Sequence, residues 1–513
     1  MHYAYLFEAR GIQRFLFASG KLRDMLGGSE LVDYICAPDG YLKQVLGSLE
    51  LDPQIPRQAG GVFYLVFSSL DEAKRMQATW RLASAQWLPG LERVDAISEG
   101  VSVKTAIENG LKKLHQERNR VMADLPRPGP LSERSPRTGL AAVSLDKGES
   151  LDAATKAMRD FRRPAGSPSL SQRFLDTRLL NQKNIHWPNN FESDARREDR
   201  FPLGSRRLVG LLHADGNGLG ELLRILNEAC ADANDNTYIK LYKCFSDGIT
   251  QATLDAAAEA TKEKLLPYAV NGVMPARPLV LGGDDLSVVI RADLALPFAE
   301  AFLTAFEIHS QKAMSVLRTA FEEAGLKESA KKLPDCLTAC AGITFMKCSQ
   351  PFQSAYELAE GLCKRAKNAS RITAAKTGKI MPSSIAFLKV QDSLLDDVDE
   401  LFEQTLCARH GDTRWELGLN AYSIKPVLGL PLLGDIYRFR DIFYGEEATT
   451  RLNDRPLREL ATLVHTNTHE ARQAYNRWRQ VSGRETASLL SSFDKVLASL
   501  FSDLHSYEEC HYI

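Results

Sequence analysis

Three aspartates have the residue type and the spacing that metal-dependent chemistry needs. Asp215 ends the apolar segment RLVGLLHAD, while Asp284 and Asp285 stand between two apolar runs in LVLGGDDLSVV. Carboxylate oxygens are hard ligands that suit Mg²⁺ and Mn²⁺. Phosphoryl transfer depends mainly on positioning the phosphates and neutralising their charge. The pattern therefore predicts that Asp215, Asp284 and Asp285 are catalytic and bind two Mg²⁺ or Mn²⁺ ions.

Small residues around these aspartates predict a nucleotide-binding loop. A loop with little side-chain bulk lets the backbone approach a triphosphate at the start of a helix. In the later segment AYELAEGLCKRAKNAS, the lysines and arginine near the carboxyl end of a predicted helix also complement the helix dipole. A triphosphate partner for the last of these lysines is an equally good explanation. The predicted nucleotide-binding residues are Gly216, Asn217, Gly218, Gly282, Gly283 and Lys367.

The elements around the aspartates predict an α+β fold. From residue 207 to 390, apolar runs and amphipathic stretches alternate in the order β-α-(α)-β-β-α-β-α-β. In a split β-α-β sheet the first strand and the hairpin are neighbours, so Asp215 and the aspartate pair are expected to meet. The alternative is that Gly-Gly-Asp-Asp serves only as a hairpin turn, a role that these residues fill well.

Composition sets the limits on function. Of the 513 residues, 44% are hydrophobic and 25% are charged, which is typical of globular proteins. The net charge of -1 gives no general attraction to nucleic acid or membranes, so any RNA contact must be local. The amino terminus lacks a signal peptide pattern, no apolar run is long enough for a membrane span, and the nine cysteines form no CxxC pair. These features predict a cytoplasmic protein with reduced thiols.

Shifts in composition divide the chain into four predicted parts. Residues 1–124 alternate strands and helices, residues 125–206 are loop-rich and Arg-rich, residues 207–390 carry the aspartates, and residues 391–513 have a helical pattern. The arginines from about Phe161 to Arg207 are interpreted as a solvated surface, with contacts to a phosphate backbone as the alternative.

Several segments resemble the large polymerase-like subunit of type III CRISPR interference complexes. HADGNGLGELL, LVLGGDDLSVV and AGITFMKCSQPFQSAYELAEGLCKRAK are similar to its second palm domain, and GIQRFLFASGKLRDMLGGSELVDYI resembles its first palm. The resemblance implies two ferredoxin-like palm domains, the first degenerate and the second with the GGDD hairpin, followed by a helical C-terminal domain. Related GGDEF cyclases have a phosphate-contacting lysine in a similar Ala-Lys pair, which supports this role for Lys367.

The resemblance implies an enzyme that converts ATP into cyclic oligoadenylate for antiviral defence, with guide RNA and other CRISPR effector subunits as partners. A weak internal repeat places Arg10, Val62 and Phe63 at the positions of the three aspartates, so the first palm is expected not to bind metal. Two alternatives are a catalytically idle scaffold subunit and a GGDEF-like cyclic dinucleotide synthase.

Two departures from the family shape the expectations. Many members begin with an HD nuclease domain, whereas this sequence starts in the palm, and none of its ten histidines is followed by Asp. We therefore expect a member that lacks the HD domain. The insertion LSERSPRTGLAAV has Ser132 and Ser135 at the spacing of zinc-binding cysteines. Because serine does not hold structural zinc, no zinc is expected.

Overall fold

The computed structural model has an α+β fold, and it divides the chain into two compact units. One unit is Met1–Leu337 with Phe345–Tyr356, and the other is Thr338–Thr344 with Glu357–Ile513. The predicted domain borders at residues 124, 206 and 391 lie outside the described residues, so the four predicted ranges stay predictions. The structure describes residues 1–119, 128–164, 166–175, 178, 184–191, 200–205, 207–231, 233–390, 398–410, 413–416, 421–444, 455–482 and 511–512.

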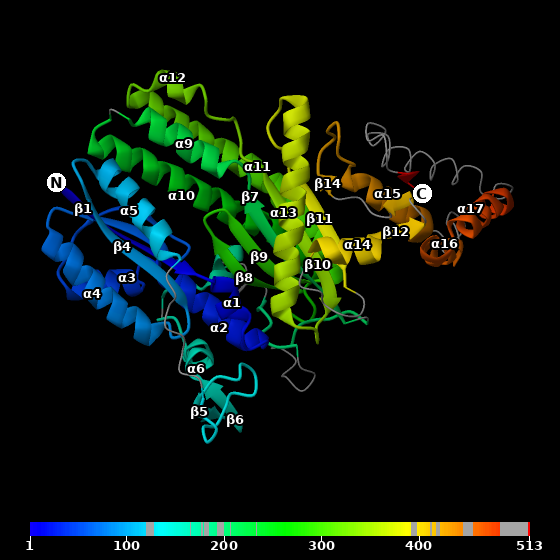
Figure 1. Ribbon diagram of the computed structural model, residues 1–513, viewed down its shortest axis with the longest axis horizontal. Coiled ribbons are helices and arrows are strands. Elements are labelled where there is room, and N and C mark those ends of the chain that lie inside the picture. Colours follow the sequence, from blue (N-terminus) through cyan, green and yellow to red (C-terminus); the bar gives the residue numbers. More distant parts are fainter. Residues whose placement is uncertain are drawn as a thin grey trace. The chain divides into compact units, whose positions relative to one another are not determined.

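The first unit contains an antiparallel sheet near the amino terminus (Figure 1). Its strands lie in the order β2-β3-β1-β4, and each neighbouring pair is antiparallel. Phe7, Phe63 and Trp80 pack together in its core, with ring centroids 5.0 to 5.2 Å apart. The elements are β1 (His2–Arg10), α1 (Ile12–Phe17), α2 (Leu22–Asp33), α3 (Tyr41–Ser48), β2 (Gln54–Ala59), β3 (Val62–Phe67), α4 (Leu70–Trp87), β4 (Glu92–Gly100) and α5 (Val103–Glu117).

A second group of strands in the same unit carries the three aspartates. Here β9 pairs antiparallel with both β7 and β8. Two long helices, α10 and α11, lie side by side (Figure 1). The elements are β7 (Leu208–Gly216), α9 (Leu219–Ala229), α10 (Asp235–Ala260), β8 (Ala276–Gly282), β9 (Asp285–Arg291), α11 (Ala292–Glu323) and α12 (Lys327–Ala330). A strand, a helical segment and a hairpin thus follow one another in both parts of this unit.

The region predicted to be loop-rich contains regular structure. It forms β5 (Ala142–Asp146), β6 (Glu149–Asp152), α6 (Ala153–Asp160) and α7 (Leu170–Phe174). The guanidinium of Arg159, 4% exposed, donates two hydrogen bonds of 2.8 and 2.9 Å to the fully buried carboxylate of Asp24 on α2. Arg163 is 8% exposed and pairs with Glu30 and Asp33. The interpretation of the arginines as a solvated surface is therefore wrong for Arg163. Arg159 and Arg163 both fix the inserted elements to α2.

Close packing of α6 on α2 depends on glycine. A Cβ atom built on Gly27 would lie 1.8 Å from the carbonyl oxygen of Met158, and one on Gly28 would lie 2.9 Å from Leu16. The backbone of α6 can therefore approach α2 only where side chains are missing, which explains the Gly-Gly pair on this helix.

The second unit combines helices with short strands. The boundary between the units falls within β10 (Ala339–Lys347), and β11 pairs with β14. The region predicted to be helical also contains short strands, since β12 and β13 pair on either side of residues 411–412. None of the described helices has the length and apolar content needed to cross a bilayer. A further boundary falls within α13 (Phe352–Thr377), after Tyr356. The other elements are β11 (Ser384–Lys389), α14 (Val398–Leu406), β12 (Cys407–His410), β13 (Thr413–Glu416), β14 (Tyr422–Ser423), α15 (Leu433–Tyr444), α16 (Arg455–Thr466), α17 (Thr468–Ser482) and β15 (His511–Tyr512).

Gly27→Ala is expected to destabilise the protein by about 1–3 kcal/mol, because the new methyl group must push α6 away from α2. Gly47→Ala on α3 is the matched control, since a Cβ there meets nothing within 4 Å. This control should be neutral or raise the melting temperature, because alanine is the better helix former. Thermal unfolding of both variants checks the prediction, and equal melting temperatures would contradict it.

The stability of the inserted elements is expected to depend on pH through the ionisation of the Glu149 carboxyl group. Burial raises the pKa of Glu149, but hydrogen bonds from Lys21, Arg159 and Arg137 outweigh it and lower the pKa from 4.5 to about 2. Because the pKa is lower in the folded state, the ionised carboxylate stabilises the protein at any pH above the pKa of the unfolded state. This stabilisation is lost as the pH falls from 4.5 towards 2. Melting temperatures across this window should fall more steeply for the wild type than for Glu149→Gln. The exposed Glu328→Gln should behave as the wild type does.

Candidate active site

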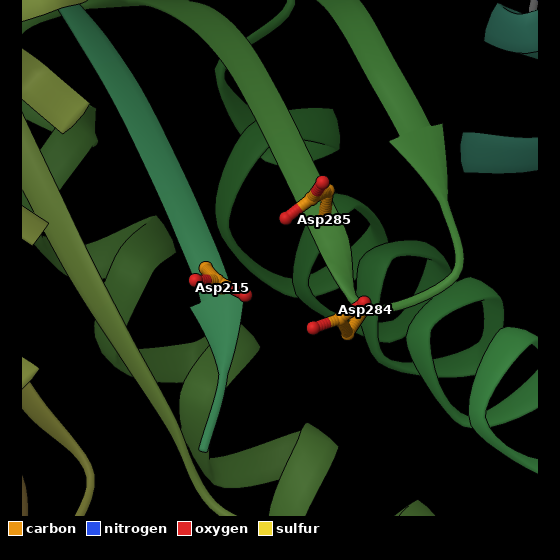
Figure 2. Close-up of side chains that lie close together, drawn as sticks. All are labelled: Asp215, Asp284 and Asp285. Atoms are coloured by element: carbon orange, nitrogen blue, oxygen red, sulfur yellow. The ribbon is translucent and has the colours of Figure 1, made fainter. Parts of the chain in front are cut away.

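Three carboxylates meet at one end of the β7–β9 pair. Asp215, Asp284 and Asp285 each offer an oxygen, and these oxygens all lie within 4.8 Å of one another. Figure 2 shows Asp215 near the end of its strand and the other two at the start of the neighbouring strand. All three residues are half-buried. Like charges at this separation repel, and a divalent cation bound between them relieves the repulsion. The donor set fits Mg²⁺ or Mn²⁺, because all its ligand atoms are carboxylate oxygens.

Strand register explains why the carboxylates meet. In the β7–β9 ladder His213 is opposite Ser287 and Ala214 is opposite Leu286. The next step along this register places Asp215 opposite Asp285, on the same face as the His213–Ser287 pair, since side chains alternate along a strand. Asp284 precedes β9 and occupies the hairpin turn after Gly283.

The turn that carries Asp284 is held by close contacts. A Cβ atom on Gly216 would lie 3.0 Å from the Cβ of Asp284 and 3.3 Å from one of its carboxylate oxygens, so a larger residue at 216 would crowd the carboxylate. Gly283 has a φ of +63°, which an L-residue rarely adopts. Its carbonyl accepts a 2.8 Å hydrogen bond from the hydroxyl of Thr253, which is 1% exposed on α10. Thr253 therefore fixes the backbone beside Asp284.

A buried cluster of three polar side chains lies next to the carboxylates. Two of its members are two residues away along the strands, on the same face of the sheet. The Nδ1 atom of His213 is 3.2 Å from the hydroxyl of Ser287 and 3.1 Å from that of Tyr356. Ser287 also donates to Tyr356 over 3.5 Å. All three are less than 10% exposed, and the ring of Tyr356 packs on Phe17 of α1, with centroids 4.8 Å apart. These contacts link the strands that carry the aspartates to α1.

The predicted nucleotide-binding residues fall in two places. Gly216, Asn217 and Gly218 lead from β7 into α9, and Gly218 is the N-cap with a φ of +76° and no side-chain cap. Gly282 ends β8, and a Cβ there would lie 3.6 Å from the Cα of Gly60 in the turn between β2 and β3. Lys367 lies on α13 within the second unit and is half-buried. Its contact with a triphosphate stays a prediction.

The structure corrects the register of the internal repeat. Both α1 and α9 begin after a glycine in the left-handed conformation, Gly11 and Gly218. Counting back three residues from each glycine matches Glu8, rather than Arg10, with Asp215. The two-residue hairpin turns, which follow Ala59 and Gly282, match Gly61 with Asp284 and Val62 with Asp285. The register expected from the sequence is therefore displaced by two residues on the strand and by one in the hairpin.

The first repeat has one carboxylate where the second has three. Glu8 is opposite Val62 in the β1–β3 ladder, and its carboxylate pairs with the guanidinium of Arg118 at 2.5 Å. Arg10 donates to the carbonyl of Arg118 at 2.8 Å. A cationic side chain thus stands beside the single carboxylate of the first repeat. That the first repeat binds no metal stays a prediction.

Sequence reasoning missed Glu8, Thr253 and the His213–Ser287–Tyr356 group. The sequence carries a signal for two of them, because His213 and Ser287 are two residues from Asp215 and Asp285 and therefore share their face of the strands. Thr253 and Tyr356 have no such signal, since their contacts depend on how helices pack on the strands.

Thr253→Val is expected to weaken Mn²⁺ binding about fivefold, because the Gly283 carbonyl loses its hydrogen bond and the turn loosens around Asp284. Thr253→Ser keeps the hydroxyl and should bind Mn²⁺ as the wild type does. Electron paramagnetic resonance of free Mn²⁺ during titration measures the affinity, with the melting temperature as a check on folding. A wild-type affinity in Thr253→Val would show that the contact does not position the carboxylate.

Comparison with known proteins adds structural neighbours at low identity. No protein-family model and no curated protein matches the sequence. A Csm1–Csm4 cassette in complex with cA4 matches with a TM-score of 0.43 and 13% identity, over 79% of this chain and 58% of that chain. Csm1 from T. onnurineus matches with a TM-score of 0.40 and 14% identity, over 74% and 52% of the two chains. The present chain thus spans little more than half the length of these neighbours. They are chains of Csm1, a subunit of the type III CRISPR systems whose large-subunit motifs this sequence resembles.

Proposed function

We propose that this protein is a Mg²⁺- or Mn²⁺-dependent nucleotidyltransferase that joins ATP into a cyclic oligoadenylate, within a type III CRISPR effector. The observation that carries the proposal is the meeting of the Asp215, Asp284 and Asp285 oxygens within 4.8 Å, beside glycine-rich backbone. The choice of ATP and of a cyclic product comes from the resemblance of the motifs.

In the proposed mechanism the three aspartates hold divalent ions, and the loop from Gly216 to Gly218 receives the triphosphate. The bound ions supply activation of a 3′-hydroxyl and neutralisation of charge on the reacting phosphate. Gly218 makes no side-chain cap on α9, so no cap side chain stands between the start of this helix and a phosphate group. Asp215 and Asp285 come from opposite strands of one ladder, which holds their relative positions without a ligand. Lys367 would contact the triphosphate.

We further propose that the two sheets are ferredoxin-like palm domains and that the first is degenerate. The β2-β3-β1-β4 order, with antiparallel neighbours, supports this assignment for the first. For the second, the support is that its hairpin and β7 repeat the arrangement of β1 to β3, including the left-handed glycine before each helix. The absence of two of the three carboxylates from the first repeat would leave catalysis to the second. Guide RNA and other effector subunits are the proposed partners.

Asp215→Asn, Asp284→Asn and Asp285→Asn should each lower product formation by orders of magnitude, because each keeps the side-chain shape but removes a charged ligand. Folding should be kept or slightly improved, since each variant relieves repulsion in the metal-free protein. The control is Asp335→Asn, whose side chain is 98% exposed. Purified proteins are incubated with each nucleoside triphosphate and Mg²⁺ or Mn²⁺, with and without RNA, and the products are identified by mass.

Two results would contradict the proposal. If the wild type makes product and all three variants keep pace with it, the catalytic metal lies elsewhere. If the wild type consumes no nucleotide even with RNA and partner subunits present, the protein is a scaffold rather than an enzyme.

A further inference from the structure

A cavity of about 670 Å³ lies in the first unit, and none of the three aspartates is among its lining residues. It is bordered by the start of α2, the turn of the β5–β6 hairpin and residues 348–352. Its volume falls within the range of about 300–1,000 Å³ that is usual for ligand sites. No step of the proposed nucleotidyl transfer uses it.

Cations predominate in the lining of this cavity. Arg159 pairs with the buried carboxylate of Asp24 and also with Asp146 and Glu149. Lys21 and Arg137 are held by one carboxylate, Glu149, at 2.9 and 3.2 Å. Glu149 therefore orients cationic side chains from two different segments around the same space.

Two further cations in the lining are weakly compensated. The guanidinium of Arg23 is 3.8 Å from its nearest carboxylate partner, Asp146, which is at the outer limit of an ion pair. Lys147 is exposed and takes part in no ion pair among the described residues. The side chains of Arg23 and Lys147 can therefore reorient towards a bound anion without breaking a short ion pair.

The backbone at Lys147 supports a role beyond folding. Lys147 and Gly148 form the two-residue turn between β5 and β6, with φ angles of +51° and +82°. A turn with both central residues at positive φ favours Asn-Gly, and a lysine in the first place is strained. Arg207, another cationic residue at positive φ, contacts the cavity residue Cys348 through its guanidinium, 3.8 Å from the sulfur. Strained residues that persist in this way are a mark of functional sites.

We propose that this cavity binds the phosphate groups of a polyanion, either a nucleic-acid strand or a free polyphosphate. Arginine presents a planar fork of donors that matches phosphate oxygens, and lysine adds a compact charge. Arg23 lies on α2 and Lys147 in the β5–β6 turn, and Arg23 lies near Asp146, the residue before Lys147, so one run of phosphates can contact both.

Binding is measured on the full chain in EDTA, which keeps divalent ions away from the aspartates. The probes are inorganic tripolyphosphate, ATP, a short single-stranded RNA and an oligoglutamate of similar charge. The variants are Lys147→Asn, Arg23→Gln and their combination, and the control is Lys312→Gln, an exposed lysine on α11. Lys147→Asn is the sharpest variant, because asparagine suits the turn better than lysine. Its melting temperature should hold or rise while its phosphate affinity falls.

We expect the phosphate probes to bind the wild type and the control equally, and the double variant about tenfold more weakly. The dependence of log affinity on log salt should become shallower by about one for each cation removed from a phosphate. Binding of RNA alone identifies a strand as the ligand, whereas binding of tripolyphosphate and ATP alone identifies a free polyphosphate. The proposal is overturned if no phosphate probe binds, if the double variant binds as the wild type does, or if oligoglutamate binds as tightly as the phosphate probes.

Discussion

The register between β7 and β9 is the constraint on which the candidate site depends. A strand that slips by one residue turns every side chain to the other face of the sheet. In the observed register, Ala214 is opposite Leu286, so Asp215 and Asp285 share a face and the turn adds Asp284 from the same edge. Buried apolar residues on the opposite face, including Leu212, Ala214 and Leu286, make such a slip costly. The geometry of the carboxylates is therefore maintained by hydrophobic burial at neighbouring positions, even though the carboxylates repel one another.

Much of this site could be predicted because its signals are local. The apolar run that ends in Asp215 and the Gly-Gly-Asp-Asp turn each indicate a strand end, and their order along the chain indicates that they meet. The positions of Thr253 and Tyr356 are beyond sequence reasoning, since a residue in a long helix shows its burial but not its partner. The inserted region misleads for a related reason. Arg163 looks solvent-exposed from the composition of its segment, and its burial is made favourable by Glu30 and Asp33, which are distant in the sequence.

The two repeats show how one framework can keep its backbone while its chemistry diverges. Left-handed glycines begin α1 and α9, and both hairpins turn through two residues. Glu8 stands at the position of Asp215, but its neighbours are Gly61 and Val62, and Arg118 pairs with it. A lone carboxylate next to a guanidinium is paired within the chain, whereas three adjacent carboxylates repel one another. In the proposed function, a bound divalent cation relieves this repulsion in the second repeat.

The buried pair of Asp24 and Arg159 has a consequence for how the chain is made. The two residues are 135 positions apart, so the ribosome must add all the intervening residues before the pair can close. Until then, burying Asp24 would leave a carboxylate without its partner, which is strongly unfavourable. During synthesis the Asp24 face of α2 is therefore expected to stay hydrated until α6 has emerged and packed on it.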